Sequence, residues 1–313
     1  MVRPGSLVRV LLVLLLTASG AVYAQNQVKP NQLLVFISAT DASGVPLTDL
    51  KPEEIAYTES GTPGKVVSLD RHQLPIKLTI AIDNGKDSQP ALASLREGLT
   101  GMVQALPPDL EVTLITMSQP QMFVRPTTDH AQLTQGIARF GPESNAVAKF
   151  SEVLVEYADR IEKDFKDKKL TYAPLLLMVS SSTPELENVQ PDTIQKALNT
   201  LRTRGARVSV IMMTTTPTNT DSVANMTQGR QALIATPIVK ASGGKFEAVV
   251  QFTRLATLLP EWGKEIAVAH TKQANQFRAI IDRPGGATGA LNNLGLKLTR
   301  PGAEGSVSPD GRF

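Results

Sequence analysis

The sequence predicts an α/β protein with a doubly wound, mostly parallel sheet and a small β module formed by the N- and C-terminal segments. Between residues 75 and 270, short apolar runs alternate with amphipathic stretches at helical spacing, which is typical of parallel strands joined by crossover helices. The flanking segments instead combine short alternating runs with clusters of turn residues. With 313 residues, 42% of them hydrophobic, the chain can bury a sizeable core.

Residues 1–24 have the features of a secretory signal peptide. Arg3 and Arg9 give it a basic start, Val10–Leu16 is unbroken apolar sequence, and Val22-Tyr23-Ala24 provides small residues before a cleavage point. We therefore expect a mature chain that begins at Gln25 and is periplasmic or secreted. The apolar run is too short to span a bilayer, so no transmembrane segment is expected after the leader is cleaved.

Composition excludes several classes of function. The chain contains no cysteine, which rules out disulfides, zinc-thiolate sites and a lipidated N-terminal cysteine. Removing the two arginines of the leader leaves 30 basic residues against 29 acidic ones, so the mature chain is almost neutral. Nothing in this balance indicates nucleic-acid binding.

Residues 25–74 are expected to form an N-terminal β module. Leu33–Thr40 reads as a strand, and Asp41–Pro46 is a turn cluster. A single helical turn should follow at Leu50–Ile55. Two further strands, Ala56–Glu59 and Lys65–Leu69, are predicted to form a hairpin through residues 60–64.

The α/β region at residues 75–270 begins with a strand, a loop and a helix. Lys77–Ile82 is short, rich in β-branched residues and bounded by Pro75 and by Asn84-Gly85, which favours a buried strand. The helix that follows has apolar residues at helical spacing: Leu92, Leu95, Leu99, Met102 and Leu106. The next strand is predicted at Glu111–Met117, with Gln121–Arg125 pairing beside it.

The remainder of this region continues the alternation. A long amphipathic helix carries Val147, Phe150, Leu154, Tyr157, Ile161 and Phe165, and Leu175–Val179 is a central strand, apolar on both faces. The elements expected after it are a helix at Pro191–Arg204, a strand at Arg207–Met213, a polar loop at Thr214–Gln228, a helix at Arg230–Ala241 interrupted by Pro237, an edge strand at Lys245–Val249 and a helix at Phe252–Val268.

Residues 271–300 return to a β-like pattern. Gln276–Ile281 and Leu294–Thr299 flank the glycine-rich link Pro284–Gly289, and we expect both strands to pack on the N-terminal module. The last segment, residues 301–313, is expected to be loosely ordered.

The strand at Lys77–Ile82 and the loop after it carry a family resemblance. An apolar strand that ends on Asp83 and leads into a helix resembles the first segment of the metal-ion-dependent adhesion site of von Willebrand factor A (VWA) domains. Gly85 and Asp87 stand where that family has two serines, and Ser88 comes one residue late. The preceding module resembles the N-terminal module of a bacterial secreted group related to the VWA domain.

The other two segments of the family's metal site are also altered. Gly141–Ala146 resembles the loop that would supply a threonine but contains none, and Leu175–Val179 runs into Ser180-Ser181-Ser182 where the family has a second aspartate. A hydrated Mg²⁺ ion needs several oxygen ligands at short distances, and most of them are missing. The resemblance therefore implies a VWA fold with a degenerate metal site.

From this resemblance we expect a non-enzymatic interaction protein of the adhesion or scaffold type. Its partner would be another exported or envelope protein, bound without a cofactor at the rim where the parallel strands end, because open α/β sheets bind ligands there. The residues expected at this rim are Asp83, Asn84, Gly85, Asp87, Ser88, Ser144, Asn145, Ser181 and Ser182.

Two alternatives stay open at this point. Asp83, Asp87 and Asn145 could hold a Mg²⁺ or Ca²⁺ ion in a metal-dependent adhesion module. A serine hydrolase is the other alternative, because hydroxyls follow a strand at Ser180–Ser182, although the three histidines are isolated and no Gly-x-Ser-x-Gly motif occurs. Against both, the hydroxyls could cap the next turn, and Asp83 could bind the backbone amides of its own loop.

Overall fold

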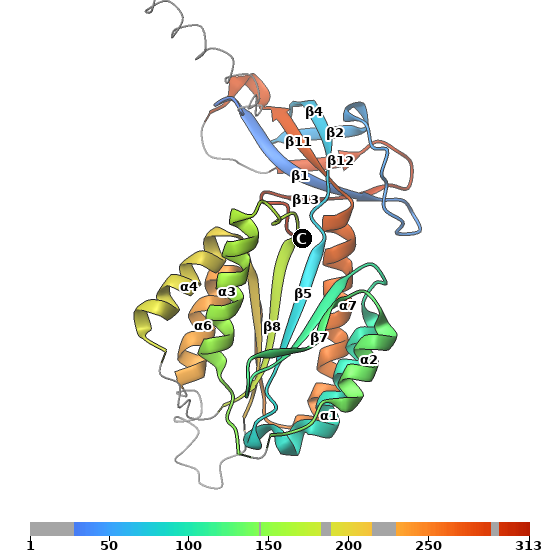
Figure 1. Ribbon diagram of the computed structural model, residues 1–313. Coiled ribbons are helices and arrows are strands. Elements are labelled where there is room, and N and C mark those ends of the chain that lie inside the picture. Colours follow the sequence, from blue (N-terminus) through green and yellow to red (C-terminus); the bar gives the residue numbers. More distant parts are fainter. Residues whose placement is uncertain (1–27, 144, 183–188, 215–229, 289–293) are drawn as a thin grey trace, which may run out of the picture.

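The computed structural model describes residues 28–143, 145–182, 189–214, 230–288 and 294–313. The chain forms a large α/β unit with a small β module stacked on one end of it (Figure 1). The signal-peptide prediction for residues 1–24 lies outside the described residues. So do Ser144 and the part of the predicted polar loop that follows Thr214.

A six-stranded sheet forms the centre of the α/β unit. The strand order is β10-β9-β8-β5-β6-β7, and every neighbouring pair is parallel except β6 and β7. Counted from β5, the order is that of a doubly wound sheet, in which the direction of winding reverses between the first and fourth strands. The strands are β5 (Ile76–Ile82), β6 (Glu111–Thr116), β7 (Gln121–Thr127), β8 (Ala173–Ser181), β9 (Arg207–Met213) and β10 (Phe246–Val249).

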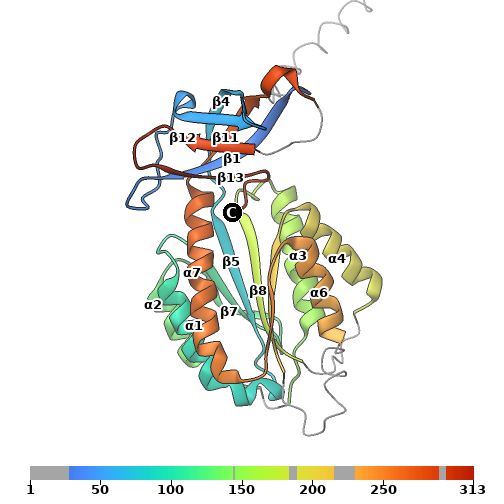
Figure 2. The same cartoon turned by 180° about the vertical axis from the view of Figure 1, so that it is seen from behind.

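Helices cover both faces of this sheet (Figures 1 and 2). One face packs against α1 (Leu92–Ala105), α2 (His130–Arg139) and α7 (Leu255–Ala274), and its core includes Leu78 and Leu177. The opposite face packs against α3 (Phe150–Lys166), α4 (Pro191–Thr203) and α6 (Arg230–Ser242), and its core includes Met178 and Val210. The predicted doubly wound α/β fold is therefore confirmed.

The β module combines segments from both ends of the chain in two antiparallel sheets. The first has the order β13-β1-β11-β4, and the second has the order β12-β2-β3. Apolar side chains from both, such as Ile37, Tyr57 and Phe277, form one core between them. The strands are β1 (Gln32–Thr40), β2 (Ile55–Glu59), β3 (Thr62–Pro63), β4 (Lys65–His72), β11 (Gln276–Asp282), β12 (Leu294–Leu298) and β13 (Glu304–Ser308).

The two crossings between the module and the α/β unit lie side by side. The Leu74 amide, before β5, donates to the Gln273 carbonyl at the end of α7, at 2.9 Å. The buried ring of His270 accepts from the Ile76 amide at Nδ1, at 3.2 Å, and its Nε2 lies 3.3 Å from Asp109 Oδ2. Because the amide proton occupies Nδ1, Nε2 is the nitrogen that donates. These contacts anchor α7 and β5 to each other where the chain enters and leaves the module. The described residues also include the short 3-10 helices Pro52–Glu54, Lys86–Ala91, Phe252–Arg254 and Pro284–Gly286.

Three predictions about local structure are wrong. The expected hairpin of Ala56–Glu59 with Lys65–Leu69 does not form. β2 pairs with the two-residue β3 and with β12, whereas β4 pairs with β11 in the other sheet. The segment 301–313 is not loosely ordered, since β13 pairs with β1. Helix α6 is not interrupted, since it continues through Pro237 to Ser242, with Ile238 and Val239 packed on the sheet.

Among the described residues, one helix was not predicted. The ten-residue α2 begins after Asp129, whose side chain accepts hydrogen bonds from the Ala131 and Gln132 amides and so caps the helix. An aspartate just before Leu133 and Ile137, four residues apart, was the available signal. No helix among the described residues is both long and apolar enough to cross a membrane.

Candidate functional site

The predicted rim lies at the end of the sheet farthest from the β module (Figure 1). Asp83 follows β5, and Ser181 is the last residue of β8. These two strands are adjacent and parallel, and the winding of the sheet reverses between them. Carboxyl ends of strands at such a switch point diverge into loops on opposite faces, which leaves room for a ligand. Below, we call this end of the sheet the carboxyl edge.

Asp83 links the ends of the two central strands. Its side chain is only 1% exposed, and both carboxylate oxygens accept backbone hydrogens: Oδ1 from the Gly85 amide at 2.8 Å and Oδ2 from the Ser181 amide at 2.9 Å. The Asp83 amide in turn donates to the Val179 carbonyl at 2.8 Å. Bonds to a charged acceptor are stronger than neutral ones. The contact with Gly85 is the Asx-type turn considered from the sequence, and the contact with Ser181 extends it to β8.

Asn84 joins the same loop to β6 and to the loop before α3. Its Oδ1 accepts from the Ser118 amide at 3.2 Å and from the Ser118 hydroxyl, while Nδ2 donates to the Gly141 carbonyl at 3.4 Å. The Asn84 carbonyl also accepts from the Glu143 amide at 2.7 Å. Ser118 was missed from the sequence. The signal that could have found it is a hydroxyl just beyond the end of a predicted strand, as at Ser180–Ser182.

Gly85 allows the loop before α3 to close onto the loop after β5. A Cβ atom added at Gly85 would lie 2.7 Å from the Ala146 carbonyl oxygen and 3.2 Å from Asp83 Oδ1. The Lys86 amide donates to that same Ala146 carbonyl at 2.9 Å, and the buried Ser88 hydroxyl donates to the Gly85 carbonyl at 2.8 Å. A serine at position 85, as in the family pattern, would not fit without moving this backbone.

The remaining rim residues divide into buried and outward-facing groups. Asp87 and Ser182 are half-buried, whereas Asn145, Lys86 and Gln89 are exposed. Ser181 is 4% exposed, and its hydroxyl has no hydrogen-bond partner among the described residues. The structure thus brings Asp83, Asn84, Gly85, Ser88 and Ser181 together in a buried network, with Asp87 and Asn145 at its outer side.

Among the described residues, the donor set at this edge does not fit a divalent cation. Within the described parts of the chain, no three histidine, cysteine, aspartate or glutamate side chains come together in a way that could hold a metal ion. Of the three suggested ligands, Asp83 binds two backbone amides through its oxygens, and Asn145 is exposed. Mg²⁺ requires near-octahedral oxygen ligation, and Ca²⁺ takes six to eight oxygens.

The three histidines occupy other parts of the molecule. His270 lies beside the start of β5, His72 ends β4 in the β module, and His130 begins α2. A serine at the end of β8 would need a base within hydrogen-bond reach to act as a nucleophile. The positions of the histidines give the hydrolase alternative no support.

Comparisons with known proteins add a resemblance of fold. No protein-family model matches the chain, and no curated protein matches it. Among solved structures, a von Willebrand factor type A protein from Catenulispora acidiphila aligns with a TM-score of 0.47 and 9% identity over 76% of this chain and 51% of that one. The SpRpn10 VWA domain aligns with a TM-score of 0.42 and 13% identity, covering 59% of this chain and 95% of that one.

A third similar structure is the human COPII-coat protein Sec24c, with a TM-score of 0.44 and 14% identity over 63% of this chain and 32% of that chain. The chain matches only about half of the Catenulispora protein and about a third of Sec24c. These are similarities of fold to VWA domains and other proteins, at low identity, and they assign no activity to this chain. The class that strand order and packing define is a doubly wound α/β protein with an attached β sandwich.

Proposed function

We propose that this chain is an exported, non-enzymatic interaction protein that binds a partner protein at the carboxyl edge of its six-stranded sheet without a metal ion. The observation that carries the proposal is the hydrogen bonding of the Asp83 carboxylate. Both of its oxygens accept backbone amide hydrogens, so the carboxylate acts as a structural link.

The surroundings of Asp83 support a preformed contact surface. Asn84 fixes the loops after β5, after β6 and before α3 relative to one another. Polar side chains on the outer side of this network, including Lys86, Gln89, Gln119 and Asn145, are exposed to solvent. Loops held by a rigid sheet commonly carry binding residues, because the surface they present needs little ordering when a partner docks.

Export remains part of the proposal and rests on the leader alone. Arg3, Arg9 and the apolar run Val10–Leu16 are its basis, with Gln25 as the first residue of the mature chain. The corresponding partner would be another exported or envelope protein.

Site-specific photo-crosslinking tests which surface makes the contact. A photoreactive amino acid at Lys86 or Asn145, both exposed at the carboxyl edge, is expected to crosslink one discrete partner in the producing cell. The matched control position is Arg202, which is exposed near the end of α4 at the opposite edge of the sheet. Crosslinks from position 202 alone, or equal yields from all three positions, would contradict the proposed surface.

A further inference from the structure

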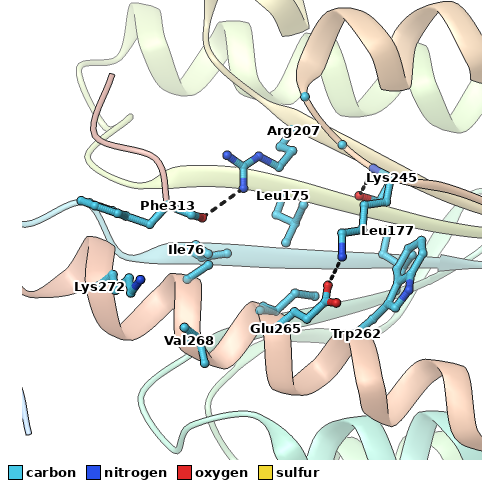
Figure 3. A pocket seen from close by; sticks show the side chains of 15 residues that line it. Ile76, Leu175, Leu177, Arg207, Lys245, Trp262, Glu265, Val268, Lys272 and Phe313 are labelled. Atoms are coloured by element: carbon cyan, nitrogen blue, oxygen red, sulfur yellow. Dashed lines mark hydrogen bonds and ion pairs between the residues drawn. The ribbon is translucent and has the colours of Figure 1, made fainter. Parts of the chain in front are cut away.

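A hollow lies on one face of the sheet at the end opposite the carboxyl edge, next to the β module. It has a volume of about 390 Å³ and is formed between α7 and the first halves of β8 and β9 (Figure 3). The hollow follows from the topology. In the sequence, β9 lies between α4 and α6, and both of these helices pack on the opposite face of the sheet. On this face, α7 therefore covers the start of β9 from one side only. We call this hollow the α7 groove.

Apolar side chains line most of the α7 groove. Ile76, Leu175 and Leu177 come from the strands, and Trp262, Ile266 and Ala269 come from successive turns of α7. Ligand pockets in proteins commonly have volumes of roughly 300–1,000 Å³ and are lined by apolar residues with a few placed polar groups. The groove has this size and character.

One end of the groove is cationic. Arg207, at the start of β9, is half-buried, and its Nη1 donates a long hydrogen bond of 3.4 Å to the Phe313 carbonyl. Its Nε is buried without a hydrogen-bond partner among the described residues. Lys272 lies at the same end, 5.8 Å from the centre of the Phe313 ring, and donates to the Ser306 hydroxyl at 3.0 Å (Figure 3).

The electrostatics at Arg207 favour an anion. Burial lowers the pKa of Arg207, nearby Arg312 lowers it further, and the charge of Asp310 offsets only part of this effect. A desolvated guanidinium with an unused N–H is costly unless an acceptor reaches it, and carboxylates match its geometry.

The other end of the groove is electrically balanced. Lys245, just before β10, forms an ion pair with Glu265 of α7, and both side chains are more than half exposed. Trp262 and Leu177 lie at this end (Figure 3). The groove therefore has an apolar, neutral end and a cationic end.

We propose that the α7 groove binds an amphipathic carboxylate. Its apolar tail would lie along Leu175, Leu177 and Trp262, and its carboxylate would accept hydrogen bonds from Arg207 at the end near Phe313. This site is separate from the proposed protein contact at the carboxyl edge, so either can be present without the other.

Trp262 provides the readout, because it is the only tryptophan in the chain. Decanoate titrated into the full-length mature protein should change its fluorescence and saturate. The uncharged 1-decanol should bind about tenfold or more weakly, since a hydrogen-bonded charge contributes at least that factor. Decyltrimethylammonium, which carries the opposite charge, should bind weakest.

Substitutions separate the head group from the tail. Arg207→Gln should weaken decanoate binding about tenfold or more and leave 1-decanol binding unchanged, whereas Arg207→Lys should keep part of the preference for decanoate. Ala269→Phe should fill the groove and abolish binding of both ligands. The matched control, Arg202→Gln, changes an exposed arginine on α4 and should bind decanoate like the wild type.

Several outcomes would overturn the proposal. These are no saturable response to any ligand, equal affinity for decanoate and decyltrimethylammonium, or unchanged decanoate binding in a folded Arg207→Gln variant. A second copy of the chain is the competing occupant. A dimeric mass in light scattering that Ala269→Phe reduces to a monomer would assign the groove to that copy instead.

Discussion

Asp83 holds the ends of the two central strands together through its carboxylate. Sequence alone places this residue at the end of a buried strand, since the apolar run of β5 stops there. The Gly85 amide is a partner that an Asx-type turn would supply, but the second partner could not be predicted. The Ser181 amide is distant in sequence, and a family pattern that assigns Asp83 to a metal gives no reason to expect two amide donors. The same pattern names serines but says nothing of Gly85, whose role depends on the approach of Ala146.

Replacing Asp83 by asparagine should destabilise the protein. The asparagine side chain would lack the charge that strengthens two hydrogen bonds, and its amide nitrogen would face either the Gly85 or the Ser181 amide, donor against donor. We expect a loss of about 1–3 kcal/mol in the free energy of unfolding, measured by urea denaturation. Millimolar Mg²⁺ or Ca²⁺ should leave the wild-type value unchanged. Stabilisation of the wild type by either ion that Asp83→Asn abolishes would show that Asp83 helps to bind it.

Gly85→Ala tests the close approach of the two loops. The new methyl would meet the Ala146 carbonyl at 2.7 Å, so the backbone must shift, at a cost of about 1–3 kcal/mol of unfolding free energy. Gly141→Ala is the control, because a Cβ there would have its nearest neighbour at 3.9 Å and the residue has no positive φ. That variant should stay within about 0.5 kcal/mol of wild type. Equal effects of the two substitutions would argue against a steric role for Gly85.

At the scale of elements, the sequence predicts the strongly patterned strands and helices and misses those fixed by distant contacts. β5, β8 and β9 are recognisable because they are apolar runs bounded by breakers. β13 is not, since Glu304–Ser308 is short and has Val307 as its one large apolar residue, and it becomes a strand only by pairing with β1. β2 and β4 are strands as predicted, but their partners are β12 and β11 from the other end of the chain.

Arg300 joins this C-terminal segment to the turn before β2. Its Nε and Nη2 donate to the two carboxylate oxygens of Glu54 at 2.7 and 2.8 Å, and Nη1 donates to Asp49 at 2.8 Å. The hydrogen bond from Arg300 is the largest cause that lowers the pKa of Glu54, from an ordinary 4.5 to about 2, and the Lys51 amide contributes next.

This pKa predicts how stability should depend on pH. A carboxyl group whose pKa is lower in the folded state stabilises the fold fully above its unfolded pKa and loses that contribution as the pH falls through the folded value. The difference in melting temperature between wild type and Arg300→Gln should therefore be constant above pH 4.5 and shrink towards pH 2. Calorimetry across this range checks it. Glu97→Gln, an exposed change on α1, is the control and should show little difference from wild type throughout.

At the scale of the whole molecule, one stretch of α/β sequence interrupts a β sandwich built from the two chain ends. The order of patterns along the sequence indicates this arrangement, because β-like segments flank the alternating region. The residue boundaries assigned to the parts stay predictions. The α7 groove could not be predicted, since Arg207, Trp262 and Phe313 are brought together only by the sheet order and by the return of the chain past β13.

Export is tested on the intact protein. If Val22-Tyr23-Ala24 is the cleavage site, the mass of the exported chain should equal that of residues 25–313. Intact-mass spectrometry of the protein recovered outside the cytoplasm measures this. A mass that retains residues 1–24 would indicate an uncleaved anchor and contradict a periplasmic or secreted location.

The central claim is that the carboxyl edge contacts its partner without a metal ion. Crosslinking from a photoreactive residue at position 86 tests it directly when the yield is compared in excess chelator and in millimolar Mg²⁺ or Ca²⁺. Because Asp83 is bonded to the Gly85 and Ser181 amides, we predict the same partner and the same yield under all these conditions. A yield that disappears in chelator and returns with Mg²⁺ or Ca²⁺ would contradict the account and establish metal-dependent adhesion.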